Sequence, residues 1–253
     1  MLAAERRKVI LDILKREGRV VAPRLSGALG VSEDTIRRDL REMAAEGLLQ
    51  RVHGGALPTS PALANYHTRQ QNITPAKIAI ARKAASLIQE DMVILMGGGT
   101  TTVEVARSLS PELHATVITH NLPAAVALAD LEQVEVVLVG GHLYKHSMVT
   151  IGSEAVDTIR MLRADLCLLG VCSLHPEIGI STQDMEEAYF QRAMIASSAE
   201  VAALASPEKI GTAAPYISGS ISDLNYIITD ELLPDDQLAP YRAFHVDILR
   251  STI

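Results

Sequence analysis

A chain of 253 residues that is 48% hydrophobic, with no Trp and a net charge of −7, can bury a sizeable aliphatic core in one large or two smaller domains. Two cysteines exclude a disulfide framework and a cysteine-based zinc site, so Cys167 and Cys172 are expected to be buried free thiols. Charges interrupt the N-terminal segment, and every apolar run is shorter than the ~20 residues that span a bilayer. We therefore expect a cytoplasmic protein without a secretory signal or a membrane partner.

The first predicted elements are three helices and a hairpin. Apolar side chains recur at helical spacing through residues 4–17, and a second short helix fits residues 22–30. After a turn, Ser32 is a good N-cap for a third helix over residues 33–47. The segment "GLLQRVHGGALP" (47–58) then has the pattern of a short strand, a tight turn and a returning strand. This order of elements predicts a winged helix-turn-helix.

The third predicted helix is expected to contact DNA. Ile36, Leu40 and Met43 form its apolar stripe, which leaves Arg37 and Arg38 pointing away from the core. Residues 1–58 carry 11 Lys and Arg against 8 Asp and Glu (+3), whereas the remainder carries 12 against 22 (−10). The alternative is a solvated face in which the two arginines pair with nearby carboxylates, but the cap and the wing favour DNA. The predicted DNA contacts are Arg24, Ser32, Glu33, Thr35, Arg37, Arg38, Arg41, Arg51 and His53.

This N-terminal segment resembles the DNA-binding domain of the DeoR-type bacterial repressors. That family's spaced signature is present as Arg6, Ile10, Leu14, Ser32, Thr35, Ile36, Arg37, Arg38, Asp39 and Leu40. The wing sequence "RVHGGA" (51–56) is also similar. The resemblance implies a repressor that binds a double-stranded DNA operator as a homo-oligomer, a dimer or higher. We interpret Asp39 as a structural partner of nearby arginines.

Residues 59–74 are polar, contain prolines and lack periodicity, so they are predicted to form a linker between a 1–58 domain and a 75–253 domain. In the larger domain, short apolar runs alternate with helical patterns, which predicts an α/β fold with a mainly parallel sheet covered on both faces. The predicted strands are 92–96, 115–119, 134–140, 165–171, 200–205, 225–229 and 244–249. The predicted helices are 76–89, 101–109, 122–129, 154–163, 184–198 and 231–239.

Glycine-rich or polar clusters follow five of these strands, at 97–102, 119–121, 140–145, 170–173 and 206–211. Because parallel strands end at the same edge of a sheet, the clusters predict a single site there. "GGGTTT" (97–102) has neither the Lys of a P-loop nor the last Gly of a dinucleotide fingerprint. Its bare backbone and hydroxyls at a helix start suit a phosphate, although a plain tight turn is the alternative. The predicted effector contacts are Gly98, Gly99, Thr100, Thr101, Thr102, Thr119, His120, Asn121, Gly140, Gly141, Glu187 and Lys209.

The larger domain resembles the sugar-phosphate sensor domain of the same family, whose fold is related to ribose-5-phosphate isomerase and CoA-transferases. The matching residues are Gly99, Thr100, Thr101, Thr119, Gly140, Gly141, Gly170, Glu187, Ala188, Lys209 and Gly211. The resemblance implies a phosphorylated sugar as effector. Several sugar-contact positions of the family differ in this chain, which leaves the identity of the effector open; they are Gly97, His120, His142, Cys172 and Ser206.

Two function classes remain at this point: a ligand-controlled regulator, and a sugar-phosphate isomerase with an appended DNA-binding domain. An isomerase needs a tuned pair of carboxylates, and Glu187 lacks a partner in the sequence pattern. The sequence therefore predicts sensing without catalysis, and no cofactor. His114, His120, His142 and His146 match no metal-ligand spacing, so no metal is predicted.

Overall fold

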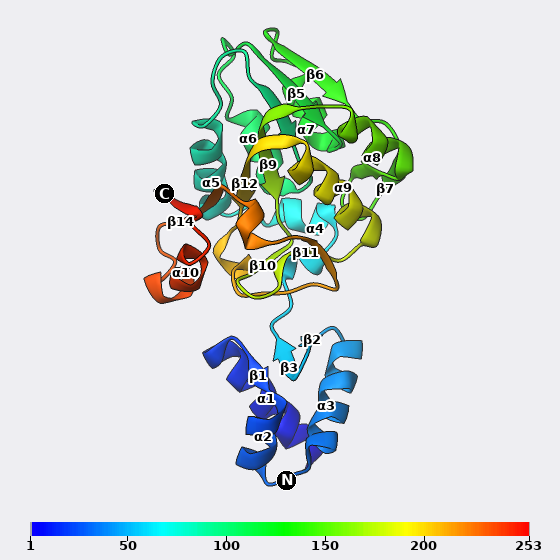
Figure 1. Ribbon diagram of the computed structural model, residues 1–253, viewed down its shortest axis with the longest axis vertical. Helices are drawn as coiled ribbons and strands as arrows, with labels where there is room; N and C mark the ends of the chain where they lie inside the picture. Colours follow the sequence, from blue (N-terminus) through cyan, green and yellow to red (C-terminus); the bar gives the residue numbers. More distant parts are fainter. Residues whose placement is uncertain (1, 253) are drawn as a thin grey trace.

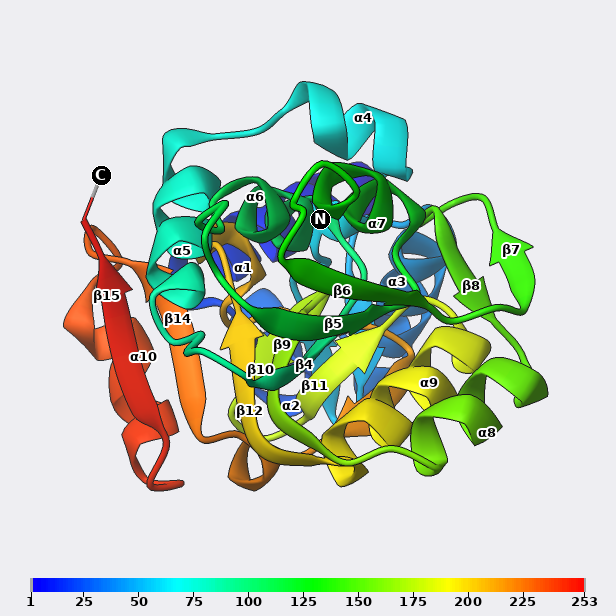
Figure 2. The ribbon, with the colours of Figure 1, turned by 90° about the horizontal axis from the view of Figure 1, so that it is seen from above.

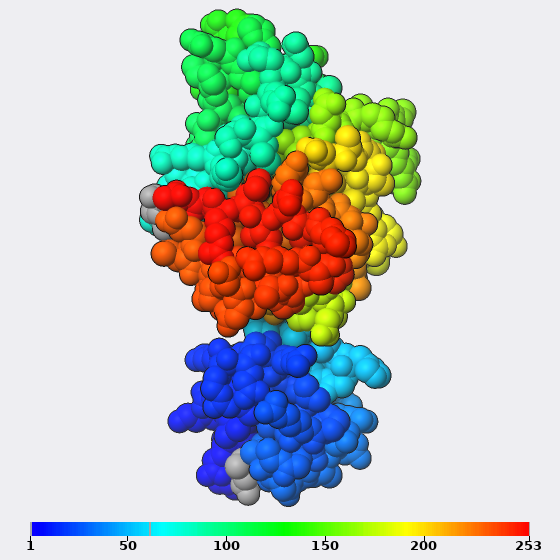
Figure 3. All heavy atoms as spheres, turned by 60° about the vertical axis from the view of Figure 1, so that its left-hand side comes forward, coloured from blue at the N-terminus to red at the C-terminus, as the bar shows by residue number. Residues whose placement is uncertain are grey.

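The N-terminal part of the chain folds into a small helical unit, the head, at one end of the molecule (Figure 1). The computed structural model describes residues 2–252. A space-filling view shows a constriction between the head and the rest of the protein (Figure 3). The elements of the head are α1 (Ala3–Glu17), β1 (Val20–Val21), α2 (Ala22–Leu29), α3 (Glu33–Ala45), β2 (Gln50–Val52) and β3 (Gly55–Leu57).

The head has its own apolar core, as its helical periodicity predicts. Ile36, Leu40 and Met43 on α3 are at most 2% exposed and pack against α1 and α2. Ser32 caps α3 by accepting a hydrogen bond from the backbone N–H of Thr35. The three short strands pair in the order β1-β3-β2, with β2 and β3 as the wing. The winged helix-turn-helix prediction is confirmed.

Asp39 forms a buried ion pair that ties α3 to α1. Its carboxylate accepts hydrogen bonds from Arg6 Nε at 2.6 Å and Arg6 Nη2 at 3.1 Å, and both side chains are more than nine-tenths buried. The bidentate geometry holds the guanidinium plane against one carboxylate. The interpretation of Asp39 as a structural residue is confirmed.

The segment after the head, predicted to be a linker, contains more structure than its composition indicates. It includes a 3₁₀ turn, η1 (Pro61–Leu63), and a short helix, α4 (Tyr66–Gln71). The Tyr66 side chain is 3% exposed and packs into an apolar cluster of the larger domain, which we call the sensor. A single apolar anchor in a polar stretch has no periodicity, so pattern reasoning does not detect it. The predicted division into 1–58, 59–74 and 75–253 stays a prediction.

The sensor is built on a seven-stranded sheet with the order β15-β14-β12-β9-β4-β5-β6, in which every neighbouring pair is parallel. The predicted parallel α/β fold is confirmed, and each predicted strand is present with small shifts at its ends. The strands of this sheet are β4 (Val93–Met96), β5 (Ala115–Thr119), β6 (Val134–Leu138), β9 (Ala164–Gly170), β12 (Ser198–Leu204), β14 (Tyr226–Asp230) and β15 (Asp247–Ser251).

Helices cover both faces of the sheet (Figure 2). Successive residues of a strand point to opposite faces, so Ile94 and Met96 join the cluster under α5, α6 and α7, whereas Leu95 joins the cluster under α8, α9 and α10. Among the described residues, no helix combines the length and apolarity required to cross a membrane. The helices are α5 (Pro75–Ala85), α6 (Thr100–Arg107), α7 (Leu122–Leu128), α8 (Ser153–Arg160), α9 (Met185–Ala196) and α10 (Asp235–Arg242).

Small strands outside the main sheet were not predicted. A hairpin joins β7 (His142–Tyr144) and β8 (Val149–Ile151), and three further strands form a sheet in the order β10-β11-β13. The runs are too short for an alternating pattern to stand out in the sequence. The remaining elements are β10 (Ser173–His175), β11 (Gly179–Thr182), β13 (Tyr216–Gly219), η2 (Pro207–Lys209) and η3 (Ile221–Asp223).

Candidate functional site

The strand order places a crevice at the carboxyl ends of β4 and β9. The chain leaves β4 toward β5 and β6 on one side, and then returns to the other side of β4 to form β9. The loops after β4 and β9 leave in opposite directions, so a crevice opens between them. Such a position is called a switch point, and ligands of open α/β sheets bind there. The loop after β4 is the glycine- and threonine-rich segment, and the loop after β9 carries Cys172.

A small cavity of about 30 Å³, which we call the switch-point cavity, lies at this crevice. Five of the predicted effector residues line it: Gly98, Gly99, Thr101, Glu187 and Lys209. The lining also contains residues that were not predicted as contacts, namely Ala62, Arg69, His146, Ser147, Gly170, Val171, Cys172, Thr182, Gln183 and Gln191.

The backbone of the glycine loop shapes one wall of the switch-point cavity. Gly99 is the N-cap of α6 with φ of +113°, and it has no side chain to occupy the first N–H groups of the helix. A Cβ at Gly170 would lie 1.9 Å from the backbone oxygen of Gly98, so only glycine allows the two loops to approach this closely. The start of α6 therefore directs backbone N–H groups and the positive end of the helix dipole toward the crevice.

Three of the predicted contacts stabilise the glycine loop instead of lining the cavity. The Asn121 side-chain amide donates to the backbone oxygens of Gly97 and Gly99 at 3.3 and 3.2 Å, and to Thr102 Oγ1 at 3.0 Å. The Thr119 hydroxyl donates to the Met96 oxygen at 2.7 Å. Thr102, Thr119 and Asn121 are at most 1% exposed. Their hydroxyls and amide are used inside the protein, so the structure does not place them at the cavity.

His120 is also absent from the lining. Its ring stacks on Phe190 with 3.9 Å between the ring centroids, and Nδ1 lies 2.9 Å from the backbone oxygen of Thr150. Burial lowers the pKa of His120 to about 4, so the ring is neutral at physiological pH. A neutral tautomer that donates from Nδ1 supports the wall behind Gly98 as a packing group.

Lys209 brings a positive charge to the switch-point cavity from the turn after β12. Burial, and to a smaller extent the nearby Arg69 charge, lower the pKa of Lys209 to about 8. No hydrogen bond or ion pair of its ammonium group is found within residues 2–252. A buried ammonium without a partner is costly, and an anion in the cavity would supply that partner.

Glu187 provides the cavity with its carboxylate, from the first turn of α9. Burial raises the pKa of Glu187, and hydrogen bonding from Ser147 and Thr182 opposes that rise. Thr182 Oγ1 lies 3.4 Å from Glu187 Oε2. Among the described lining residues Glu187 is the one carboxylate, so the arrangement offers a hydroxyl acceptor and lacks the paired acids of an isomerase.

Two buried polar atoms in the lining have no hydrogen-bond partner among the described residues: Thr101 Oγ1 and Arg69 Nε. Buried polar groups are nearly always satisfied, so an unsatisfied pair at one cavity indicates a binding function. Arg69 was missed in the sequence because it lies in the segment interpreted as a linker. Its charge is visible there, but its position depends on how α4 packs.

A larger cavity of about 350 Å³, the adjoining cavity, lies beside the first and shares Ala62, Arg69 and Lys209 with it. Thr100, another predicted contact, lines it together with Lys77 and Glu208. Its volume falls in the range of small-molecule sites. The two cations shared by both cavities therefore stand between a narrow polar recess and a space large enough for a small ligand.

Gly140 and Gly141 lie apart from both cavities. Both glycines are exposed and lie between β6 and β7. They are far from the switch point because β6 is the edge strand of the sheet. The histidines also separate: His114 faces Glu90 on the surface, His142 is exposed, and His146 lines the switch-point cavity. Across residues 2–252 no group of three or more His, Cys, Asp or Glu is arranged to hold a metal.

The positions where this chain departs from the family pattern have diverse environments. Cys172 lines the switch-point cavity and Gly97 pairs with β9 through its backbone N–H, 3.0 Å from the Leu168 oxygen. Ser206 is fully buried and donates to Glu208 Oε1 at 2.7 Å. Of these positions, Cys172 is the one placed to contact a ligand.

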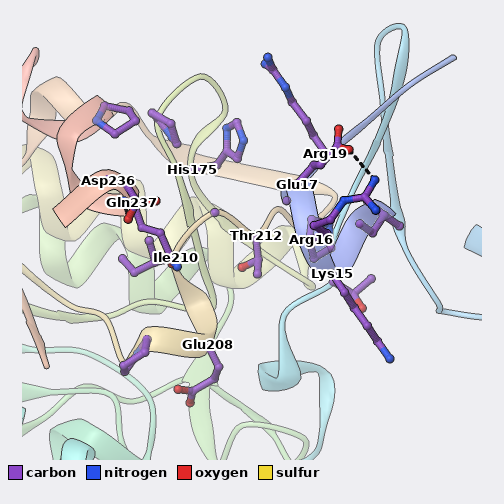
Figure 4. Close-up of a pocket in the computed structure, with 18 of the residues that line it drawn as sticks. Lys15, Arg16, Glu17, Arg19, His175, Glu208, Ile210, Thr212, Asp236 and Gln237 are labelled. Carbon is purple, nitrogen blue, oxygen red and sulfur yellow. Dashed lines mark hydrogen bonds and ion pairs between the residues drawn. The ribbon is translucent and has the colours of Figure 1, made fainter. Parts of the chain in front are cut away.

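A separate cleft of about 850 Å³, the interdomain cleft, opens between the head and the sensor. Figure 4 shows Lys15 and Arg16 from the end of α1, and Arg19 just after it, on one side, and Glu208, Asp236 and Gln237 on the other. The exposed pair Arg19–Glu177, at 3.9 Å, is an ion pair that joins the two sides. Such a pair contributes little to stability, so the cleft is a loosely joined boundary and not a built ligand site.

The predicted DNA contacts of the head are exposed or partly exposed side chains of α2, α3 and the wing and of the turn before α3. Arg24, Arg38, Arg41, Arg51 and His53 are exposed, and Arg38, Arg41 and Arg51 form no ion pair with any described residue. The alternative reading holds for one residue: the Arg37 guanidinium lies 3.0 Å from Glu33. Ser32 Oγ and Thr35 Oγ1 are 2.9 Å apart at the start of α3. The surface has the charge and form of a recognition helix, and the individual contacts stay predictions.

Comparison with known proteins shows matches along nearly the whole chain. Residues 6–61 match the DeoR-like helix-turn-helix domain, and residues 73–231 match the DeoR C terminal sensor domain. The HTH-type transcriptional repressor GlcR of Bacillus subtilis is 33% identical over 234 residues, 92% of this chain and 90% of that protein. The glycerol-3-phosphate regulon repressor of Escherichia coli K12 is 31% identical over 249 residues, 98% of this chain and 99% of that protein.

Solved structures show more distant similarity. The sorbitol operon regulator SorC of Klebsiella pneumoniae aligns with 94% of this chain and 98% of its own at a TM-score of 0.44 and 10% identity. Ribose 5-phosphate isomerase A of Methanocaldococcus jannaschii aligns with 53% of this chain and 52% of its own at a TM-score of 0.39 and 16% identity.

Proposed function

Because the chain belongs to the DeoR family of transcriptional regulators, we propose that it represses transcription until a phosphorylated sugar or related metabolite binds at the switch-point and adjoining cavities. The head binds operator DNA, and the sensor changes that binding when the effector is present. DeoR-family proteins are regulators and not enzymes, which decides against the isomerase alternative. Operator binding implies a cytoplasmic location.

The observation that carries the effector proposal is a buried cation that shares a cavity with the start of α6. The Lys209 ammonium forms no hydrogen bond or ion pair with a described residue, although the Glu208 carboxylate is close enough to raise its pKa. It lines the same cavity as Gly98, Gly99 and the unsatisfied Thr101 hydroxyl. Backbone N–H groups at a helix N-terminus together with a lysine form a typical phosphate site. A phosphate there would satisfy the ammonium group and the hydroxyl at once.

Glu187 suits the rest of such an effector. A carboxylate accepts hydrogen bonds from sugar or polyol hydroxyls, and Glu187 lines the same cavity as Thr101 and Lys209. The glycerol-3-phosphate regulon repressor of Escherichia coli is, by its name, the repressor of a regulon for a small phosphorylated polyol. We propose an effector of this chemical class, with the phosphate at α6 and hydroxyls toward Glu187.

DNA recognition by this head requires more than one copy. One α3 helix fills one major-groove segment, and helix-turn-helix proteins reach specific affinity by placing two such helices on half-sites about one helical turn apart. We therefore propose a dimer or higher homo-oligomer that is held together by the sensor. The contacts of Arg38, Arg41 and Arg51 would then repeat on both half-sites.

A thermal-shift screen tests the effector class. Purified full-length protein is heated with glycerol 3-phosphate, glucose 6-phosphate or inorganic phosphate, and separately with glycerol or glucose. A ligand that binds the native state raises the unfolding midpoint, so the phosphorylated compounds should raise it and their unphosphorylated counterparts should not. The best compound should then weaken operator binding. Equal shifts for glucose and glucose 6-phosphate would contradict a phosphate site.

A further inference from the structure

Residues 58–72, which we call the connector, join the head to the sensor and attach to the walls of the switch-point cavity. The Ser60 hydroxyl donates to the backbone oxygen of Cys172, and the Tyr66 N–H donates to the His146 oxygen at 2.7 Å. Cys172 and His146 both line the cavity. Each end of the connector is therefore fixed to a loop that a ligand in the cavity would touch.

The connector also forms part of the lining itself. Ala62 and Arg69 line both cavities, and Ala64, Thr68 and Asn72 line the adjoining cavity as well. The opposite walls come from loops at the end of a sheet whose core is closely packed and deforms little. The connector is a short helix and a 3₁₀ turn anchored mainly by Tyr66. Of the two walls, the connector is therefore the one that consists of short elements outside the main sheet.

Arg69 on α4 gives this wall a specific chemical function. Its Nε is buried without a hydrogen-bond partner among the described residues, and none of the ion pairs within residues 2–252 includes its guanidinium. The Arg69 charge contributes to the pKa shifts of both Lys209 and Glu187, which places it close to each of them. A guanidinium and an ammonium group that line one cavity, with Glu187 as its one carboxylate among the described residues, leave an excess of positive charge that suits an anionic ligand.

We propose that Arg69 is an effector-binding residue supplied by the connector, and that the contact between Arg69 and the effector anion transmits effector binding to the head. This inference rests on the proposed function, because it assigns a second cation to the same phosphate site. It goes beyond that function by naming the element that carries the signal. An anion held jointly by Lys209, the start of α6 and Arg69 fixes α4 against the sensor.

The path from α4 to the head is short. Thr59 forms an isolated β-bridge with Ala213, and the Pro58 oxygen accepts from the Ala213 N–H at 3.5 Å, directly after the wing strand β3. The turn η2 has two sides: its Lys209 faces the cavities, whereas Glu208 and Ile210 also face the interdomain cleft (Figure 4). Because the cleft is open and weakly bridged, a shift of the connector is free to change the orientation of the head.

Hydrogen exchange with inorganic phosphate as the probe tests the proposal on the full-length protein. With phosphate at about ten times its Kd, ligand binding should slow amide exchange about tenfold in every segment that the site stabilises. In the wild type we expect slowing both at residues 98–102 and across the connector. For Arg69→Gln, the phosphate concentration is raised to about ten times the Kd of this variant. Under that condition we expect slower amide exchange at residues 98–102 and no change across the connector. Arg82→Gln, an exposed arginine on α5, is the matched control and should behave as the wild type.

A second variant separates signal transmission from ligand binding. Ser60→Ala removes the hydrogen bond to Cys172, together with the one that the hydroxyl accepts from the Ala62 N–H at 3.1 Å, and changes no side chain of the lining. The phosphate affinity of this variant should equal that of the wild type. The change in the free energy of operator binding that phosphate causes should be less than half of the change in the wild type. Glycerol 3-phosphate should show the same fractional loss of its effect on operator binding.

The outcomes distinguish this proposal from the proposed function. If phosphate does not slow exchange at 98–102 in the wild type, the phosphate site itself is wrong. If exchange slows there but the connector is unaffected, or if Arg69→Gln matches the wild type, the role of Arg69 is overturned and the site remains. If Arg69→Gln abolishes phosphate binding altogether, this variant cannot report on the signal, and Ser60→Ala tests it instead. If phosphate then changes the operator affinity of Ser60→Ala as much as that of the wild type, the proposal that the connector transmits effector binding to the head is wrong.

Discussion

The recognition surface of the head and the cavities of the sensor present their functional groups in opposite ways. Arg38, Arg41 and Arg51 are exposed cations, and water solvates them until DNA replaces it. Thr101 and Lys209 are at least nine-tenths buried, and the Thr101 hydroxyl has no hydrogen-bond partner among residues 2–252. Exposed cations therefore cost the free protein almost no stability, whereas the cavity contains buried polar groups that lower stability because they are unsatisfied. We expect the effector site, more than the DNA-binding surface, to lower the stability of the protein in exchange for its function.

The largest predicted effect lies in the head. Replacing Arg37 and Arg38 together by alanine removes two cations outside the apolar stripe of α3, so the fold should be unchanged. Operator affinity should fall at least about 30-fold, since each base contact contributes about 1–3 kcal/mol. Fluorescence anisotropy at one fixed salt concentration measures this affinity.

The control for that pair is Lys8→Ala, an exposed cation on α1 away from the recognition helix. It should bind the operator as the wild type does. The double variant should also bind the effector normally, because head and cavity share no side chain. Wild-type operator affinity in the double variant would mean that α3 is not the recognition helix.

The next largest effect is expected at Lys209. Lys209→Ala removes a charge-assisted contact to the phosphate, so effector affinity should fall about 10-fold to 100-fold, while operator affinity stays unchanged. Isothermal titration with the effector found in the screen measures the loss. Lys145→Ala, which removes an exposed charge near the β7–β8 turn, should have no effect. An unchanged effector affinity for Lys209→Ala would place the phosphate elsewhere.

Gly99 tests the shape of the backbone at the phosphate site. Gly99→Ala forces a Cβ into a backbone with φ of +113°, a strain of about 1–3 kcal/mol, and should lower effector affinity about tenfold by shifting the loop. Gly152 is a matched control, because it is the N-cap of α8 with φ of 110° and lines neither cavity. Gly152→Ala should destabilise the protein similarly and leave effector affinity unchanged. If Gly99→Ala and Gly152→Ala changed effector affinity equally, Gly99 would serve only the geometry of a tight turn and would not shape the phosphate site.

Effector binding should weaken as pH rises through the pKa of Lys209, about 8. The protonated ammonium group binds phosphate, so affinity should fall by at most about tenfold between pH 7 and pH 9, where the phosphate ester is already a dianion. Burial and the charges of Arg69 and Lys77 lower this pKa, and the Glu208 carboxylate opposes that shift. Titration across this range should give a flat profile for Lys209→Ala, and a falling profile in that variant would assign the pH dependence to another group.

The same shift affects stability in the opposite direction. The pKa of Lys209 is lowered from 10.5 to about 8 on folding, so the unfolded chain binds more protons between those values. The contribution of this group to stability should therefore increase as pH rises through that window, while effector affinity decreases.

The smallest predicted effect is at Thr101. Thr101→Val keeps the shape of the side chain but removes a buried hydroxyl that has no partner among the described residues. The free energy of unfolding of the ligand-free protein should therefore increase by about 1 kcal/mol, and its unfolding midpoint should rise. Effector affinity should fall about fivefold with the lost hydrogen bond. Thr229, whose Oγ1 is also buried and unsatisfied but lies away from the cavities, is the control. Thr229→Val should raise the midpoint alone; a fall in effector affinity there would remove the distinction.

The sequence by itself determined what depends on local periodicity. The apolar stripe of Ile36, Leu40 and Met43 specifies which face of α3 is buried, and with it the exposure of the arginines beside it. Alternating apolar runs and helical patterns likewise predicted every strand of the main sheet. Strand ends and family motifs coincide at Gly99, Thr101 and Lys209, whereas Gly98 could be selected from its strand end alone and Glu187 from the family motif alone.

Only the tertiary structure decided which of the loops at the sheet edge form one site. The order β12-β9-β4 places Lys209, Cys172 and Gly98 together, and puts Gly140 and Gly141 at the far edge. Strand order arises from packing between segments distant in sequence, which no local pattern encodes. Arg69 could not be assigned for the same reason: Tyr66 inserts into the sensor core and turns a polar stretch into a wall of the cavity.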